Sequence, residues 1–90
     1  MITINYRDPR PIYVQVMDAL QKLIVSGVIA PDEKMPSVRE LAQSLAINPN
    51  TIQRAYRLLE FNGWIVTIPG KGCFVCDNEA QIEQEVGRWY

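Results

Sequence analysis

Histidine is missing from the sequence, and cysteine occurs only twice among its 90 residues, as Cys73 and Cys76. A structural zinc site takes about four ligands, most often cysteine and histidine, so these two thiols could not complete such a site within one chain. A thiol enzyme would also need a base beside its nucleophile, and the sequence offers neither a histidine nor a glycine-rich phosphate loop. The sequence therefore predicts no enzyme, no metal site and no cofactor.

Long apolar runs are also missing. No stretch approaches the roughly 20 apolar residues that a membrane-spanning helix needs, and the N-terminal segment MITINYRDPR has no basic stretch followed by an apolar core. We therefore expect a cytoplasmic protein. Hydrophobic residues make up 48% of the composition and charged residues 21%, which is the usage of a folded globular chain. The length suits one small domain.

The chain has little net charge, but its charges are unevenly placed. The formal net charge is −1. Residues 34–57 carry four basic side chains and one acidic side chain, a local charge of +3, whereas residues 77–90 carry four acidic and one basic, a local charge of −3. Association depends on the local field and not on the total. An anionic partner is therefore expected at the middle segment, and a solvated surface of mixed charge is the alternative.

The two cysteines have the spacing C-x-x-C, which leaves two interpretations open. If they lie in a strand, residues three apart point to opposite faces, which separates the two thiols. Two small side chains packed in a strand is then the favoured interpretation. A redox pair, or half of a site shared between chains, is the alternative.

A first helix is predicted over residues 11–26. From position 12 the apolar residues recur at i, i+4, i+8, i+11 and i+12, the pattern of a helix with one buried stripe. Pro11 suits the first helical position, and Gly27 can adopt the positive φ that ends a helix. In the turn-rich connection that follows, Val28 and Ile29 are expected beneath the core.

A helix-turn-helix follows this connection. Residues 37–45 open with the capping box S-V-R-E, in which the Ser37 hydroxyl accepts from the backbone three residues later. Residues 49–61 open with Asn-Pro, an N-cap followed by a favoured first residue. Only Ala46 and Ile47 connect the two, and such a short turn predicts a helix-turn-helix.

After the third helix the sequence changes from helical to extended character. The runs WIVTIP and CFVC flank a G-K-G turn, so residues 64–76 are predicted as a β-hairpin with Gly70 and Lys71 at its tip. Three helices followed by a hairpin form a winged helix. The predicted fold class is mainly α with a small β-hairpin.

The chain divides into three predicted parts. Residues 1–10 are expected to form an extended N-terminal arm, and residues 11–77 the winged helix-turn-helix domain. In residues 78–90 the apolar Ile82 and Val86 recur at i, i+4, the start of a further helix that is too short to bury its own stripe.

The outward face of the third helix carries side chains suited to nucleic acid. With Ile52, Ala55 and Leu59 turned inward, the helix exposes Asn50, Thr51, Gln53, Arg54 and Arg57. Arginine pairs with guanine, asparagine and glutamine pair with adenine, and threonine contacts phosphate or thymine. A helix N-terminus also favours phosphate. An ordinary solvated face is usually richer in glutamate and lysine, whereas this one has no acid before its last turn. The pattern therefore predicts DNA binding.

Residues 11–75 resemble the DNA-binding domain of GntR-family bacterial transcription regulators. The resemblance rests on four motifs at family spacing: PIYVQV, MPSVRELA, NPNTIQRAY and the G-x-G-x-F-V of the hairpin. The NPNT form and the short chain are most similar to the YtrA-type subfamily. Its members carry only a small helical dimerisation segment after the winged helix, which would match residues 78–90.

The resemblance implies a sequence-specific regulator, most often a repressor, that binds an inverted-repeat operator in double-stranded DNA as a homodimer. Helix 49–61 would lie in the major groove and residues 69–72 at the adjacent minor groove. Matched motif by motif, the implied DNA contacts are Ser37, Arg39, Asn50, Thr51, Gln53, Arg54, Arg57, Gly70 and Lys71.

Pro49 stands where some other branches of the family have a polar or basic residue that contacts DNA. Base recognition is therefore expected from Asn50, Gln53 and Arg54, and a phosphate contact from Arg57.

Two alternatives remain for the function. One is a winged helix that binds protein, which would need an apolar exposed stripe, and the other is the DNA-binding part of a larger effector-responsive regulator. The sequence names neither the operator nor an effector.

Overall fold

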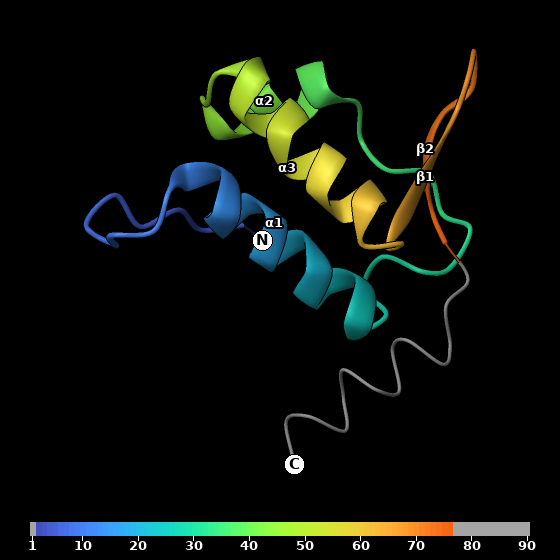
Figure 1. The fold of residues 1–90 in the computed structure, drawn as a ribbon, viewed down its shortest axis with the longest axis horizontal. Coiled ribbons are helices and arrows are strands. Elements are labelled where there is room, and N and C mark those ends of the chain that lie inside the picture. Colours follow the sequence, from blue (N-terminus) through green and yellow to red (C-terminus); the bar gives the residue numbers. More distant parts are fainter. Residues whose placement is uncertain (1, 77–90) are drawn as a thin grey trace.

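The computed structural model describes residues 2–76, in which three helices are followed by a two-stranded antiparallel hairpin (Figure 1). The elements are α1 (Ile12–Val25), α2 (Val38–Leu45), α3 (Pro49–Phe61), β1 (Ile65–Ile68) and β2 (Gly72–Val75). This confirms the predicted mainly α fold with a small hairpin. The helix predicted from residue 78 onward lies outside the described residues.

The helix ends follow local capping rules. α3 has the predicted bounds, because the Asn48 side chain accepts from the Asn50 N–H at 2.9 Å and starts the helix there. α2 begins one residue later than predicted, since Ser37 is its N-cap and its hydroxyl accepts from the Glu40 N–H at 3.0 Å. α1 also begins one residue later, because Pro11 keeps an extended ψ of 150° and is the N-cap.

α1 and α3 lie side by side, α2 packs against α3, and the hairpin follows the end of α3 (Figure 1). The helices α1 and α3 each bury one apolar stripe, and burial of such a side chain contributes about 1.5–3 kcal/mol. In residues 2–76 no helix is both long enough and apolar enough to cross a membrane. The main buried side chains are Val16, Leu20, Ile24, Leu41, Ala42, Ile52, Ala55, Leu59, Trp64, Ile65 and Val75.

Tyr56 ties α3 to the segment that leads into α2. Its ring is buried with 3% exposure, and its hydroxyl donates to the Pro36 carbonyl at 2.7 Å. Burial raises the pKa of this phenol, so the hydroxyl stays a donor under physiological conditions. The bond fixes the start of α2 relative to α3.

The hairpin is fastened to the helices by a third extended segment. Residues 32–35 run beside β2, where the Met35 N–H donates to the Cys73 carbonyl at 2.8 Å and the Val75 N–H donates to the Glu33 carbonyl at 2.9 Å. β2 therefore lies between β1 and this segment. The base of the hairpin is held from both sides, whereas its tip projects away from the helices (Figure 1).

Two local features differ from the sequence predictions. The N-terminal arm is docked and not simply extended, because the Gln15 side chain accepts from the Asn5 N–H at 2.9 Å and donates to the Asn5 carbonyl at 3.0 Å and the Arg10 carbonyl at 3.2 Å. Val28 was expected beneath the core but is 60% exposed, whereas Ile29 is buried at 9%. The turn directs only one of these two neighbours inward.

Ala46 holds a conformation that disfavours side chains. It ends α2 with a φ of 55°, in the left-handed region, where a Cβ is strained and glycine is not. Asp32 also has a positive φ, of 63°, but aspartate tolerates this region better than alanine. The helix-turn-helix therefore carries local strain at Ala46.

We expect Ala46→Gly to stabilise the fold by about 0.5–1 kcal/mol, because glycine relieves the strain of the left-handed turn. Urea unfolding followed by circular dichroism measures the change. Ala19→Gly, in the middle of α1, is the matched control and should destabilise by about 1 kcal/mol. Equal destabilisation by both substitutions would show that Ala46 is not strained.

We expect Tyr56→Phe to lower the free energy of unfolding by about 1–2 kcal/mol, because the Pro36 carbonyl loses its donor. The same urea titration measures this. Tyr6 is 72% exposed, so Tyr6→Phe should leave stability unchanged and serves as the control. If both variants unfold at the wild-type midpoint, the buried hydrogen bond contributes nothing.

Candidate nucleic-acid interface

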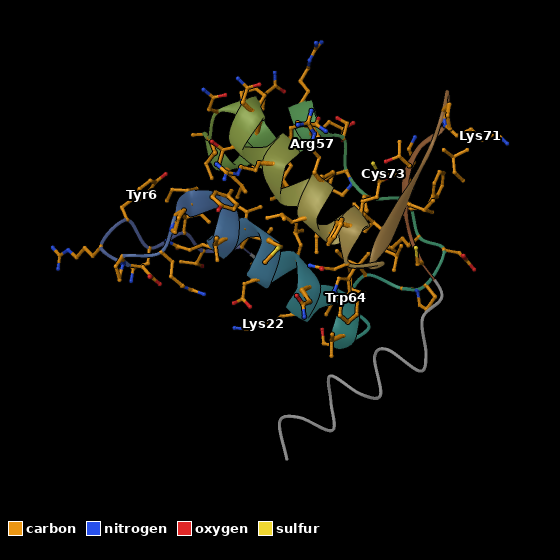
Figure 2. The ribbon with its side chains drawn as sticks, in the orientation of Figure 1. Tyr6, Lys22, Arg57, Trp64, Lys71 and Cys73 are labelled. Carbon is orange, nitrogen blue, oxygen red and sulfur yellow. The ribbon has the colours of Figure 1, made fainter. Side chains whose placement is uncertain are left out.

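The start of α2, the outward face of α3 and the hairpin tip border one hollowed surface. A cleft of about 430 Å³ between the start of α2 and the hairpin is lined by residues that include Lys34, Ser37, Thr67 and Lys71. A second cavity of about 170 Å³ lies between α3 and the hairpin and includes Gln53, Arg57 and Thr67. Figure 2 shows Lys71 at the hairpin tip, with Cys73 between it and Arg57. Of the predicted contacts, the structure brings Ser37, Gln53, Arg57, Gly70 and Lys71 to these two cavities, whereas Arg39, Asn50, Thr51 and Arg54 lie outside them.

The exposed residues of α3 divide between three directions. At about 3.6 residues per turn, Asn50 points opposite the buried stripe, and Arg54 and Arg57 lie at similar angles on either side of it. All three are exposed. Gln53 lies on the flank that faces the hairpin, where it lines the cavity with Thr67. Arg54 lies on the side of the helix that faces α1. The structure therefore separates Gln53 from Arg54, which the sequence prediction had grouped as base-reading residues.

Arg54 is stacked on an aromatic ring of α1. Its guanidinium carbon lies 4.0 Å from the ring centroid of Tyr13, within the range of a cation–π interaction. Tyr13 was not among the contact residues predicted from the sequence. No local signal could have found it, because the contact joins the first turn of α1 to the middle of α3.

The N-terminal end of α3 favours negative charge, whereas α2 carries Glu40 in its first turn. The first turn of α3 has no acidic side chain, so the partial positive charge of this helix end is not neutralised there. Thr51 lies half-buried in the same turn. At α2, the Ser37 oxygen accepts from Glu40, and its hydroxyl proton is still able to donate. Arg39 is exposed on the first turn of α2.

The hairpin tip combines a tight turn with two lysines. Gly70 has a φ of 76° and Gly72 a φ of 116°, and the Lys71 N–H donates to the Ile68 carbonyl at 2.9 Å. A Cβ on Gly72 would meet the Lys34 Cε at 3.0 Å. Lys34 thus lies across the hairpin and adds a second cation to the cleft. Sequence analysis counted Lys34 in the basic segment but did not predict it as a contact.

Two further side chains hold the hairpin beside α3. Glu60 accepts from the Thr67 N–H at 3.0 Å, so its carboxylate fastens β1 to the end of α3. The Thr67 hydroxyl lies 3.4 Å from the Cys73 sulfur. Cys73 packs partly against the core, and both cysteines are free thiols. Burial raises the pKa of the Cys76 thiol, which disfavours its reactive thiolate form.

Comparisons with known proteins match most of the chain. Residues 12–75 fit the family model described as bacterial regulatory proteins, gntR family. The chain is 42% identical over 78 residues to the HTH-type transcriptional repressor YtrA of Bacillus subtilis, covering 87% of this chain and 60% of that protein. It therefore spans about 60% of the length of that relative.

Solved structures share the fold. YtrA from Sulfolobus acidocaldarius, a GntR-family transcription factor, is 33% identical with a TM-score of 0.81, over 98% of this chain and 93% of that chain. AraR(DBD) in complex with operator ORX1 is 30% identical with a TM-score of 0.75, over 83% of this chain and 96% of that chain. Sequence motifs, fold and the family model agree, and the chain belongs to the GntR family of bacterial regulatory proteins.

Proposed function

We propose that the protein is a sequence-specific DNA-binding transcription regulator that acts as a repressor. The observation that carries this proposal is the outward face of α3, where Asn50, Gln53 and Arg57 are exposed. Gln53 and Arg57 line the cavity beside the hairpin, and Lys34 and Lys71 line the adjoining cleft together with Glu40. These polar and basic groups suit base edges and phosphates. The identity to a transcriptional repressor and the similarity to a domain bound to its operator support the same function.

In the proposed complex α3 lies in the major groove and the hairpin tip reaches the adjacent minor groove. We assign base contacts to Asn50 and Gln53. A base contact by Arg54 remains a prediction from the sequence. The proposed DNA-contacting residues are Ser37, Arg39, Asn50, Thr51, Gln53, Arg54, Arg57, Gly70 and Lys71.

We further propose that the protein binds an inverted-repeat operator as a homodimer in the cytoplasm. One α3 reaches only a few base pairs, and two copies related by a two-fold axis would read two half-sites about one helical turn apart, or a multiple of that. Residues 11–77 would form the DNA-binding domain and residues 78–90 the start of the dimerisation segment. This arrangement takes its support from the family and from the apolar pattern of the C-terminal sequence.

Selection of bound duplexes from a random DNA pool, at near-physiological salt, tests the function. We expect an enriched inverted repeat. Gln53→Ala should relax the preference at one position of each half-site by about 1–3 kcal/mol, because the amide that pairs with a base is removed. Gln21→Ala, on α1, is the matched control and should keep the motif. A folded wild-type protein that enriches no sequence would refute sequence-specific binding.

Lys71→Ala should weaken binding to the enriched duplex and to a mixed-sequence duplex by the same factor, because a phosphate contact carries no sequence information. The slope of log affinity against log salt should fall by about 0.9 for each phosphate that the variant no longer neutralises. Lys22→Ala is the control, since Lys22 lies on α1 away from the hairpin tip (Figure 2) and pairs with Asp18 at 3.1 Å. A loss of affinity confined to the enriched duplex would contradict a phosphate role for Lys71.

A further inference from the structure

The stack between Arg54 and Tyr13 joins the proposed recognition helix to α1. The Arg54 guanidinium carbon lies 4.0 Å from the centroid of the Tyr13 ring. Tyr13 is half-buried and packs against the core, so its ring is held in place by the fold, whereas Arg54 is exposed. The ring is thus the fixed partner and the guanidinium the group that is oriented.

We propose that Tyr13 is a positioning residue that holds Arg54 on the α1 flank of α3, where Arg54 binds a DNA backbone phosphate and does not read a base. The inference rests on the proposed function, because it assigns a role within the same DNA contact. It replaces the base-reading role that the sequence pattern suggested for Arg54.

The geometry separates the groups that would meet bases from those that would meet the backbone. A helix in the major groove directs its outward side chains at the base edges, whereas a side chain held toward a neighbouring element lies nearer the phosphates that border the groove. Asn50 occupies the outermost line, and Arg54 and Arg57 lie at similar angles on either side of it. The stack draws the Arg54 guanidinium away from this line toward α1, and therefore toward a bordering strand of phosphates.

The chemistry of the stack leaves the charge of Arg54 available to DNA. A guanidinium stacks with its face, so the N–H donors along its edge stay free to form a bidentate bond to phosphate. The ion pairs found within residues 2–76 join Arg10 and Lys22 to Asp8 and Asp18 and do not involve Arg54.

The stack also restricts the conformations of the Arg54 side chain before DNA binds. An arginine that is already restricted loses less conformational entropy on binding than a freely rotating one. Removal of the ring should therefore weaken DNA binding even though Tyr13 itself touches no DNA. This effect should act only through Arg54, which distinguishes it from a general loss of stability.

A double-mutant cycle tests the proposal with Tyr13→Leu, Arg54→Ala and the double variant. Affinities are measured over a salt series for two duplexes of equal length, one enriched by selection and one of mixed sequence. Arg54→Ala should weaken both duplexes by the same factor and lower the salt slope by about 0.9 for each subunit. Tyr13→Leu should weaken both about three- to tenfold, and should weaken binding no further when Arg54 is already alanine.

Tyr13→Phe keeps the aromatic face and should bind both duplexes like the wild type. Thermal unfolding of each variant checks that it is folded. If Tyr13→Leu does not fold, Tyr13→Met replaces it in the cycle, and the Arg54→Ala arm still tests the phosphate role because Arg54 is exposed.

Each result that contradicts the proposal overturns a different part of it. Independent, multiplicative effects of Tyr13→Leu and Arg54→Ala on affinity would overturn the positioning role. An effect of Arg54→Ala that is confined to the enriched duplex would overturn the phosphate assignment and restore the base-reading role. A folded wild type that binds neither duplex would overturn the proposed function, and this inference with it.

Discussion

The packing of α3 against α1 is the constraint on which the rest of the structure depends. Leu20 of α1 and Ile52 and Leu59 of α3 are almost fully buried, and burial of each contributes about 1.5–3 kcal/mol. These contributions exceed what any exposed polar residue of α3 adds to stability. The buried stripe therefore sets the rotation of α3, and the outward direction of Asn50 and Arg57 follows from it.

Apolar burial anchors the base of the hairpin, and polar and backbone bonds then orient it. Its base is anchored by buried Trp64 and Val75, and the bond from the Thr67 N–H to Glu60 holds β1 beside the end of α3. Residues 32–35 hold the other edge. The tip is left free of the core, which suits a group that reaches toward a separate molecule.

The placement of acidic side chains explains how a chain with a net charge of −1 can present several basic side chains at α3 and the hairpin. Asp8 pairs with Arg10 in the N-terminal arm, Asp18 pairs with Lys22 in the last turn of α1, and Glu60 accepts a hydrogen bond from the hairpin. The exposed part of α3 does include one large apolar side chain, Phe61, at 87% exposure. It is isolated at the end of the helix and does not form the apolar stripe that a protein-binding helix would need.

The sequence by itself determined the elements, their order and the family. The bounds of α3 and the cap of α2 were predictable because capping and helical periodicity act within one turn of the chain. Only the tertiary structure decided three contacts: the stack of Arg54 on Tyr13, the packing of the Lys34 side chain over Gly72, and the hydrogen bonds of the N-terminal arm to Gln15. Each of these contacts joins different elements or segments of the chain, so it depends on how the helices and the hairpin pack, and no local pattern of residues encodes it.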